Sequence, residues 1–102
     1  SSVLGSLGLR SDPSSRIDSS QFPAYNASKS AINAWTISLA FELRDTGIKV
    51  NSAHPGYVQT DMGGPRATMP IVEGARTSVA LATLDADGPS GSFMHMGKVL
   101  PW

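Results

Sequence analysis

Tyr25 and Lys29 are the two residues of this sequence whose types and spacing best suit acid–base chemistry. On a helix, side chains four positions apart lie on one face, one turn above the other. A free phenol ionises near pH 10, roughly, and an ammonium within about 4–6 Å favours its phenolate. The pair is therefore suited to proton transfer. The same spacing also arises by chance, as a surface tyrosine beside a solvated lysine, so the spacing alone does not establish catalysis.

Residues 24–45 are predicted to form the helix that carries this pair, because they contain no Gly or Pro and many good helix formers. Arg44 and Gly47 are expected to mark its end. Apolar residues recur at helical spacing on two sides, and this pattern predicts cover by a sheet and by a further helix or subunit. The two sets are Ile32, Trp35, Leu39 and Leu43, and Ala34, Ile37 and Phe41.

The segments that follow this helix predict an α/β fold. Residues 48–54 read as a strand that ends at Pro55-Gly56, and a strand directly after a long helix indicates a parallel sheet. Residues 57–70 are expected to form a loop, residues 71–84 a second helix weakened by Gly74, and residues 91–95 a closing strand.

The first 24 residues are rich in Ser, Gly, Pro and Asp and are predicted to be loop. Turns are expected at Asp12-Pro13 and Phe22-Pro23. The segment 5–8 (GSLG) is not expected to be a phosphate-binding loop, since no Lys-Ser/Thr follows and no helix is predicted to begin there.

Three motifs in chain order resemble the short-chain dehydrogenase/reductase family. Residues 25–31 (YNASKSA), continued by 39–43 (LAFEL), resemble its active-site helix. Residues 47–51 (GIKVN) and 55–62 (PGYVQTDM) resemble the strand and turn after that helix, and residues 1–5 (SSVLG) resemble the family's Ser-Ser-x-x-Gly segment. The resemblance implies the C-terminal part of a Rossmann-type doubly wound parallel sheet.

The resemblance also implies an activity, the NAD(P)-dependent interconversion of a carbonyl and an alcohol, with NADP favoured over NAD. Tyr25 would be the general acid or base. Lys29 would favour its phenolate and hydrogen-bond the nicotinamide ribose. Ser2 would polarise the substrate carbonyl, although an offset of one position to Ser1 is open. The hydride itself belongs to the cofactor.

Six positions are implied as cofactor contacts: Tyr25, Lys29, Pro55, Gly56, Val58 and Thr60. Pro55 and Gly56 would shape the pocket beneath the nicotinamide, while the backbone near Val58 and the Thr60 hydroxyl would bind the carboxamide and a phosphate. Ligands of open α/β sheets bind outside the carboxyl ends of the strands, which agrees with this placement. Residues 60–69 would form part of a substrate lid.

The sequence departs from the family pattern in two ways. Ser2 and Tyr25 are 23 positions apart, and residues 12–16 read as an insertion typical of carbonyl-reductase-like members. None of the 10 glycines forms a Gly-x-Gly pair, which the dinucleotide fingerprint requires. Residues 1–102 are therefore expected to be the C-terminal portion of one NAD(P)-binding domain, without its N-terminal half and inactive alone.

Composition excludes several other functions. A net charge of +0 with 16% charged residues does not indicate the basic surface that binding to nucleic acid or an acidic membrane requires. The absence of Cys removes disulfides, thiolate nucleophiles and Cys-based metal sites. His54 and His95 are not at metal-ligand spacing, so no metal is expected. The neutral charge and the absence of Cys agree with a cytoplasmic enzyme. The family resemblance implies a small carbonyl or alcohol substrate and, for the full-length protein, a homodimer or homotetramer.

Three alternatives use the same residues differently. An extended-type nucleotide-sugar epimerase or dehydratase also uses Tyr-x-x-x-Lys, but the 39–43 continuation favours a reductase. A non-catalytic dinucleotide-binding regulator would not need Ser2, Tyr25 and Lys29 together. A small structural α/β module would leave the order of the motifs unexplained.

Overall fold

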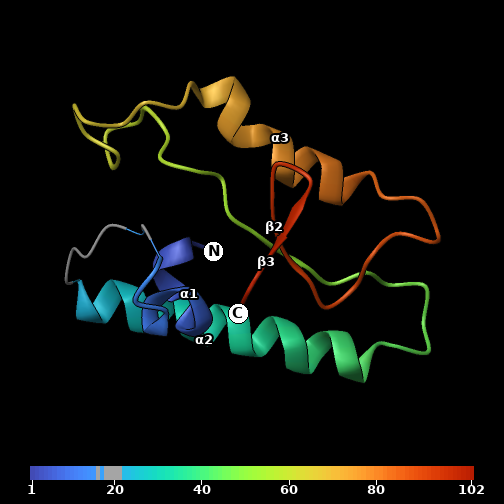
Figure 1. Cartoon of the computed structure of the whole chain (residues 1–102). Helices are drawn as coiled ribbons and strands as arrows, with labels where there is room; N and C mark the ends of the chain where they lie inside the picture. Colours follow the sequence, from blue (N-terminus) through green and yellow to red (C-terminus); the bar gives the residue numbers. More distant parts are fainter. Residues whose placement is uncertain (16, 18–21) are drawn as a thin grey trace.

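The computed structural model describes residues 1–15, 17 and 22–102, and it has an α/β architecture. Two long helices lie on opposite sides of a small sheet (Figure 1). They are α2 (Pro23–Glu42) and α3 (Ile71–Ala82). The strands are β1 (Ser52–Ala53), β2 (Phe93–His95) and β3 (Lys98–Leu100). Strand β1 pairs with β2 in parallel, and β2 pairs with β3 antiparallel. Because β1 contacts both long helices, the predicted α/β class is confirmed.

Helix α2 begins and ends at positions different from those predicted. Pro23 is its first residue, where the fixed proline φ suits a helix start, so the turn predicted at Phe22-Pro23 is wrong. The helix ends at Glu42, and Arg44 lies beyond it. The Arg44 guanidinium donates to the Phe41 carbonyl oxygen at 2.9 Å, which satisfies one of the last carbonyls of the helix. Gly47 does not take the left-handed conformation of a helix-ending glycine.

The packed face of α2 is polar, contrary to the apolar faces predicted for burial. Trp35 is 66% exposed and Phe41 is 68% exposed. The buried residues of the helix are Asn26, Asn33, Thr36 and Ala40. These side chains are small or hydrogen-bonding, and they suit a face that is held against backbone groups of neighbouring segments rather than against bulky apolar side chains.

The N-terminal segment contains two short helices where a loop was predicted. They are the 3-10 helix η1 (Val3–Gly5) and α1 (Leu7–Ser11). Ser6 is the reason that a helix begins here, because its Oγ accepts a hydrogen bond from the Leu9 N–H at 3.0 Å. The turn predicted at Asp12-Pro13 is confirmed. Residues 16 and 18–21, which belong to the predicted loop and in part to the predicted insertion, lie outside the described residues.

The C-terminal hairpin contains one predicted strand and one that the sequence did not reveal. The predicted strand 91–95 is confirmed as β2, whereas β3 was missed. The turn between them has positive φ at both Met96 (47°) and Gly97 (77°), as a tight hairpin requires. Asn-Gly is the usual signal for that turn, and Met-Gly did not suggest it. Phe93 is fully buried and stacks on Trp102, with ring centroids 5.7 Å apart.

The remaining elements agree with the predictions except in length. The strand predicted over 48–54 is regular only at Ser52–Ala53, and the second helix ends at Ala82 instead of residue 84. Gly74 is accommodated in α3 because Val58 packs against it: a Cβ there would lie 2.5 Å from Val58 Cγ2. Within the described part of the chain, no helix is long and apolar enough to cross a membrane.

Candidate active site

Tyr25 and Lys29 lie in the first turns of α2 and are adjacent in space. The Lys29 Nζ is 5.2 Å from the centroid of the Tyr25 ring, within the range of a cation–π contact. Tyr25 is 36% exposed, so a ligand could reach its phenol. The predicted pair is therefore present as a pair, with Tyr25 exposed and Lys29 half-buried.

Ser2 precedes η1 and caps it. The Ser2 side chain is largely buried, and its Oγ accepts a hydrogen bond from the Leu4 N–H at 3.2 Å. This bond uses the oxygen as an acceptor and leaves the hydroxyl proton available to a ligand. The Ser1 hydroxyl, by contrast, donates to Asn33 Oδ1 at 2.6 Å. Of the two serines, Ser2 has the hydroxyl that is less committed to structure.

The η1 segment packs directly against α2 at the turn that carries Lys29. A Cβ on Gly5 would lie 2.5 Å from both the backbone carbon and the Cβ of Lys29, so only glycine fits at this contact. The Ser30 Oγ donates to the Gly5 carbonyl oxygen at 2.8 Å. The structure thus brings the Ser2 segment onto the helix of Tyr25 and Lys29.

The end of β1 meets the same region. The Ser1 nitrogen donates to the Ala53 carbonyl oxygen at 2.8 Å, which places Ser1, two residues before η1, beside the last residue of the strand. Pro55 and Gly56 follow shortly after, and Gly56 has a φ of 100°, a conformation that favours glycine. Three of the predicted parts, the serine segment, the Lys29 turn and the strand end, are therefore neighbours.

Val58 and Thr60 lie on a loop that is bonded mainly to itself. Val58 forms an isolated bridge with Met69, and the Thr60 Oγ1 accepts from the Gly63 N–H at 3.2 Å. Among the described residues, no hydrogen bond joins Val58 or Thr60 to Tyr25 or Lys29. Their roles toward a cofactor remain predictions, as does the lid role of residues 60–69.

His54 and His95 lie side by side at the carboxyl end of the sheet, although they are far apart in sequence. Their ring centroids are 4.8 Å apart, and the His95 Nδ1 lies 2.8 Å from the His54 carbonyl oxygen. Burial, followed by the neighbouring His95, lowers the pKa of His54 from 6.5 to about 4. His54 is therefore a neutral imidazole near neutral pH.

Sequence reasoning missed the buried polar residues behind the site. Asn33 is 3% exposed, Ser52 is 4% exposed and Thr36 is 5% exposed, and they contact one another across α2 and β1. Asn26, next to Tyr25, has a buried Oδ1 without a partner among the described residues. The helical spacing of Asn26, Asn33 and Thr36 on one face of α2 was a usable signal, but the apolar residues on the other faces obscured it.

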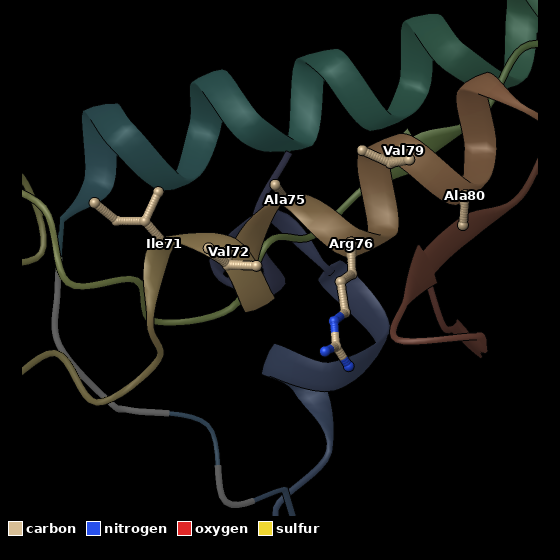
Figure 2. Close-up of a pocket in the computed structure, with 6 residues that line it drawn as sticks. All are labelled: Ile71, Val72, Ala75, Arg76, Val79 and Ala80. Carbon is tan, nitrogen blue, oxygen red and sulfur yellow. The ribbon is translucent and has the colours of Figure 1, made fainter.

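A surface groove on α3 is separate from these residues. It is apolar except for Arg76, and its side chains all come from one helix (Figure 2). None of the predicted site residues lines it. The lining residues are Ile71, Val72, Ala75, Arg76, Val79 and Ala80. In the described ranges, moreover, no three His, Asp or Glu side chains are grouped closely enough to hold a metal ion.

The fold and the site together define a class: an α/β protein with a Tyr–Lys pair at a helix start and a serine segment packed on that helix. The sequence pattern of the family described as short chain dehydrogenase matches residues 12–70, which is more than half of the chain. The chain belongs to this family, and within it to the carbonyl-reductase-like members.

Three relatives indicate where in the family the chain falls. It is 44% identical over 85 residues to Carbonyl reductase [NADPH] 1 of Mus musculus, which covers 78% of this chain and 31% of the relative. It is 36% identical over 104 residues to C-signal of Myxococcus xanthus, covering 99% of this chain and 57% of the relative. The solved carbonyl reductase Sniffer of D. melanogaster superposes with a TM-score of 0.81 at 34% identity, over 100% of this chain and 39% of that chain. The chain thus spans between about a third and three fifths of the length of these three relatives.

Proposed function

We propose that this chain is part of an NADPH-dependent oxidoreductase that interconverts a carbonyl and an alcohol. The observation that carries the proposal is the Lys29 ammonium 5.2 Å from the Tyr25 ring, on a helix against which the serine segment packs. The name of the mouse relative, a carbonyl reductase that uses NADPH, supports both the reaction and the preference for NADP over NAD.

In the proposed reaction, Tyr25 donates its phenolic proton to the carbonyl oxygen as that oxygen gains negative charge. Lys29 stabilises the phenolate that remains, because an adjacent cation favours the anionic form. The Ser2 hydroxyl, free of other described acceptors, donates a hydrogen bond to the same oxygen. In the reverse direction Tyr25 accepts the proton of the alcohol.

The residues present fit a nicotinamide cofactor. The Lys29 ammonium forms no ion pair with any described residue, and such a donor suits the hydroxyls of a ribose. Tyr25, Lys29, Pro55, Gly56, Val58 and Thr60 would hold the nicotinamide end, and the cofactor, when bound, supplies the hydride.

We also propose that residues 1–102 form the C-terminal portion of one NAD(P)-binding domain whose N-terminal half holds most of the dinucleotide. The lack of any Gly-x-Gly pair and the partial coverage of the relatives support this proposal. These 102 residues alone are then expected to be inactive, and robust NADPH oxidation by them with a panel of ketones and aldehydes would contradict the proposal.

The parent protein is proposed to be a cytoplasmic homodimer or homotetramer. The exposed apolar side chains of α2, including Trp35 and Phe41, support assembly through this helix, and the absence of Cys agrees with a reducing compartment. Carbonyl or alcohol substrates of low molecular weight are its proposed partners.

The test of function replaces Tyr25 by Phe in the full-length protein. We expect NADPH oxidation with the best ketone or aldehyde of the panel to fall by about 100-fold or more, with cofactor binding retained. Tyr57→Phe is the matched control, because Tyr57 is the other tyrosine and is 50% exposed on the loop after Gly56. Retained turnover in Tyr25→Phe would remove Tyr25 from the mechanism.

A second candidate function is a signalling role without hydride transfer. The specific observation in its favour is the similarity to C-signal, which extends over 99% of this chain. The two candidates differ in one measurement: a full-length protein that binds NADPH but reduces no member of the panel would favour the signalling role.

A further inference from the structure

The Asn33 side chain on α2 contacts two other segments of the candidate site. Its Oδ1 accepts from the Ser1 Oγ at 2.6 Å, its Nδ2 donates to the Gly5 carbonyl oxygen at 3.3 Å, and the Ser52 Oγ lies 3.3 Å from its Oδ1. Ser1 and Gly5 flank Ser2 on both sides, and Ser52 belongs to β1. A single side chain of α2 therefore contacts both the serine segment and the strand that leads to the Pro55-Gly56 turn.

Because the Asn33 amide is buried, its hydrogen bonds hold the neighbouring segments in fixed positions. Asn33 is 3% exposed, so water cannot replace a lost partner without entering the interior. The assignment of protons is also restricted. Thr36 gives its hydroxyl proton to the Ile32 carbonyl oxygen at 2.9 Å, so the single Ser52 hydroxyl proton goes either to Thr36 Oγ1 or to Asn33 Oδ1. The Ser1 bond, the shortest of the set, does not depend on that choice.

The position of Asn33 along α2 also suits an indirect role in the site. It lies one helical turn after Lys29, on the side of the helix that packs against η1, and it does not itself reach the surface where Tyr25 is exposed. Its described hydrogen bonds go to the segment that carries Ser2 and to Ser52 of β1, and none goes to Tyr25. Any effect that it has on the reaction must therefore pass through other residues.

We propose that Asn33 is a positioning residue that fixes the Ser2 hydroxyl relative to Tyr25 and Lys29 by tying both ends of the 1–5 segment to α2. The inference rests on the proposed reductase function. Misplacement of a catalytic group by about 1 Å can cost on the order of 100-fold in rate, so the contribution of Asn33 is expected to be measurable in turnover.

The test is a double-mutant cycle in the full-length protein, with NADPH and the best ketone or aldehyde of the panel. We expect Ser2→Ala to lower kcat by about 100-fold and Asn33→Leu by about 10- to 100-fold, with the KM for NADPH changed by less than about threefold. The variant carrying both changes should lie within about threefold of Ser2→Ala alone, because Asn33 has nothing left to position once the hydroxyl is gone.

Thr36→Val is the matched control. Thr36 is similarly buried on the same helix, but its described hydrogen bonds go to Ile32 and Ser52 and not to residues 1–5, so the kcat of Thr36→Val is expected to stay within about twofold of the wild type. If Asn33→Leu fails to fold, Asn33→Ala replaces it in the cycle, since the smaller side chain leaves room for a water and alanine is favourable in a helix.

Two results would overturn the inference. One is an Asn33 variant with wild-type kcat, and the other is a double variant whose loss equals the product of the two single losses, as expected for a purely structural residue. Failure of the proposed function is distinguishable, because then either the wild type would reduce no member of the panel or Ser2→Ala and Tyr25→Phe would themselves leave turnover unchanged.

Discussion

Replacement of Gly5 by alanine tests the contact that holds the serine segment on α2. The added Cβ would lie 2.5 Å from the Lys29 backbone carbon, 2.5 Å from the Lys29 Cβ and 2.8 Å from the Ser30 nitrogen. Two of these atoms belong to the backbone of a helix, which cannot move aside as a flexible side chain could. Gly5 does not have a positive φ, so the substitution introduces a steric clash without backbone strain.

The expected magnitude follows from the size of this overlap. Inserting a methyl group into a packed contact costs about 1–3 kcal/mol, and the absence of a yielding side chain places Gly5→Ala in the upper part of that range. The segment must also move away from Lys29, and Ser2 moves with it. We therefore expect turnover to fall by about 10-fold or more in the molecules that remain folded.

The assay is urea unfolding of the full-length protein together with NADPH oxidation, and Gly47→Ala is the control. A Cβ added to Gly47 would meet no atom within 4 Å beyond its chain neighbours, and Gly47 has no positive φ. Both variants reduce the entropy of the unfolded chain equally, by about 0.4–1 kcal/mol, so their difference isolates the clash. Equal free energies of unfolding in the two variants would show that η1 does not pack on Lys29 as described.

Three further predictions concern stability, each measured by urea unfolding. The pKa of His54 is lowered from 6.5 to about 4, so between these pH values the unfolded chain binds a proton at this residue that the folded chain does not. The free energy of unfolding is therefore full above pH 6.5 and falls toward pH 4. His54→Asn should reduce this loss by about 1 kcal/mol, a value that allows for the partial exposure of the ring. Phe93→Ala removes a fully buried ring and should cost about 3–5 kcal/mol, whereas Val99→Ala, at a side chain 70% exposed, should change stability by less than about 0.5 kcal/mol; equal losses would contradict the assigned core. Ser6→Ala should cost about 1–2 kcal/mol, because Ser6 caps α1 and also donates to the Pro101 carbonyl oxygen at 2.8 Å, and an unchanged midpoint would refute both roles.

The sequence predicted the parts of the site that depend on local spacing. Tyr25 and Lys29 are four residues apart on a helix without Gly or Pro between them, and this spacing alone brings them together. The order of helix, strand, turn and helix was also predictable locally, because each of these elements has a distinct amino-acid composition. The packing of Gly5 on Lys29 was not predictable, since it joins residues that no periodicity relates.

The buried face of α2 shows why hydrophobic periodicity failed there. Trp35 and Phe41 are the largest apolar residues of the helix, yet the described chain buries Asn33 and Thr36 instead. A face that packs closely against backbone groups needs small or hydrogen-bonding side chains, and apolar periodicity does not detect such a face. The strand β3 was missed because its turn residues, Met96 and Gly97, carry only half of the usual hairpin signal.

The two tryptophans lie in different environments, so their fluorescence can report on two different processes. Trp35 is solvent-exposed on the outer side of α2, whereas Trp102 is half-buried and stacked on the fully buried Phe93. Indole emission shifts to shorter wavelength when the ring leaves water, so covering α2 changes the Trp35 signal while loss of the core changes that of Trp102. Replacing either tryptophan by Phe would therefore separate the fluorescence of assembly from the fluorescence of unfolding.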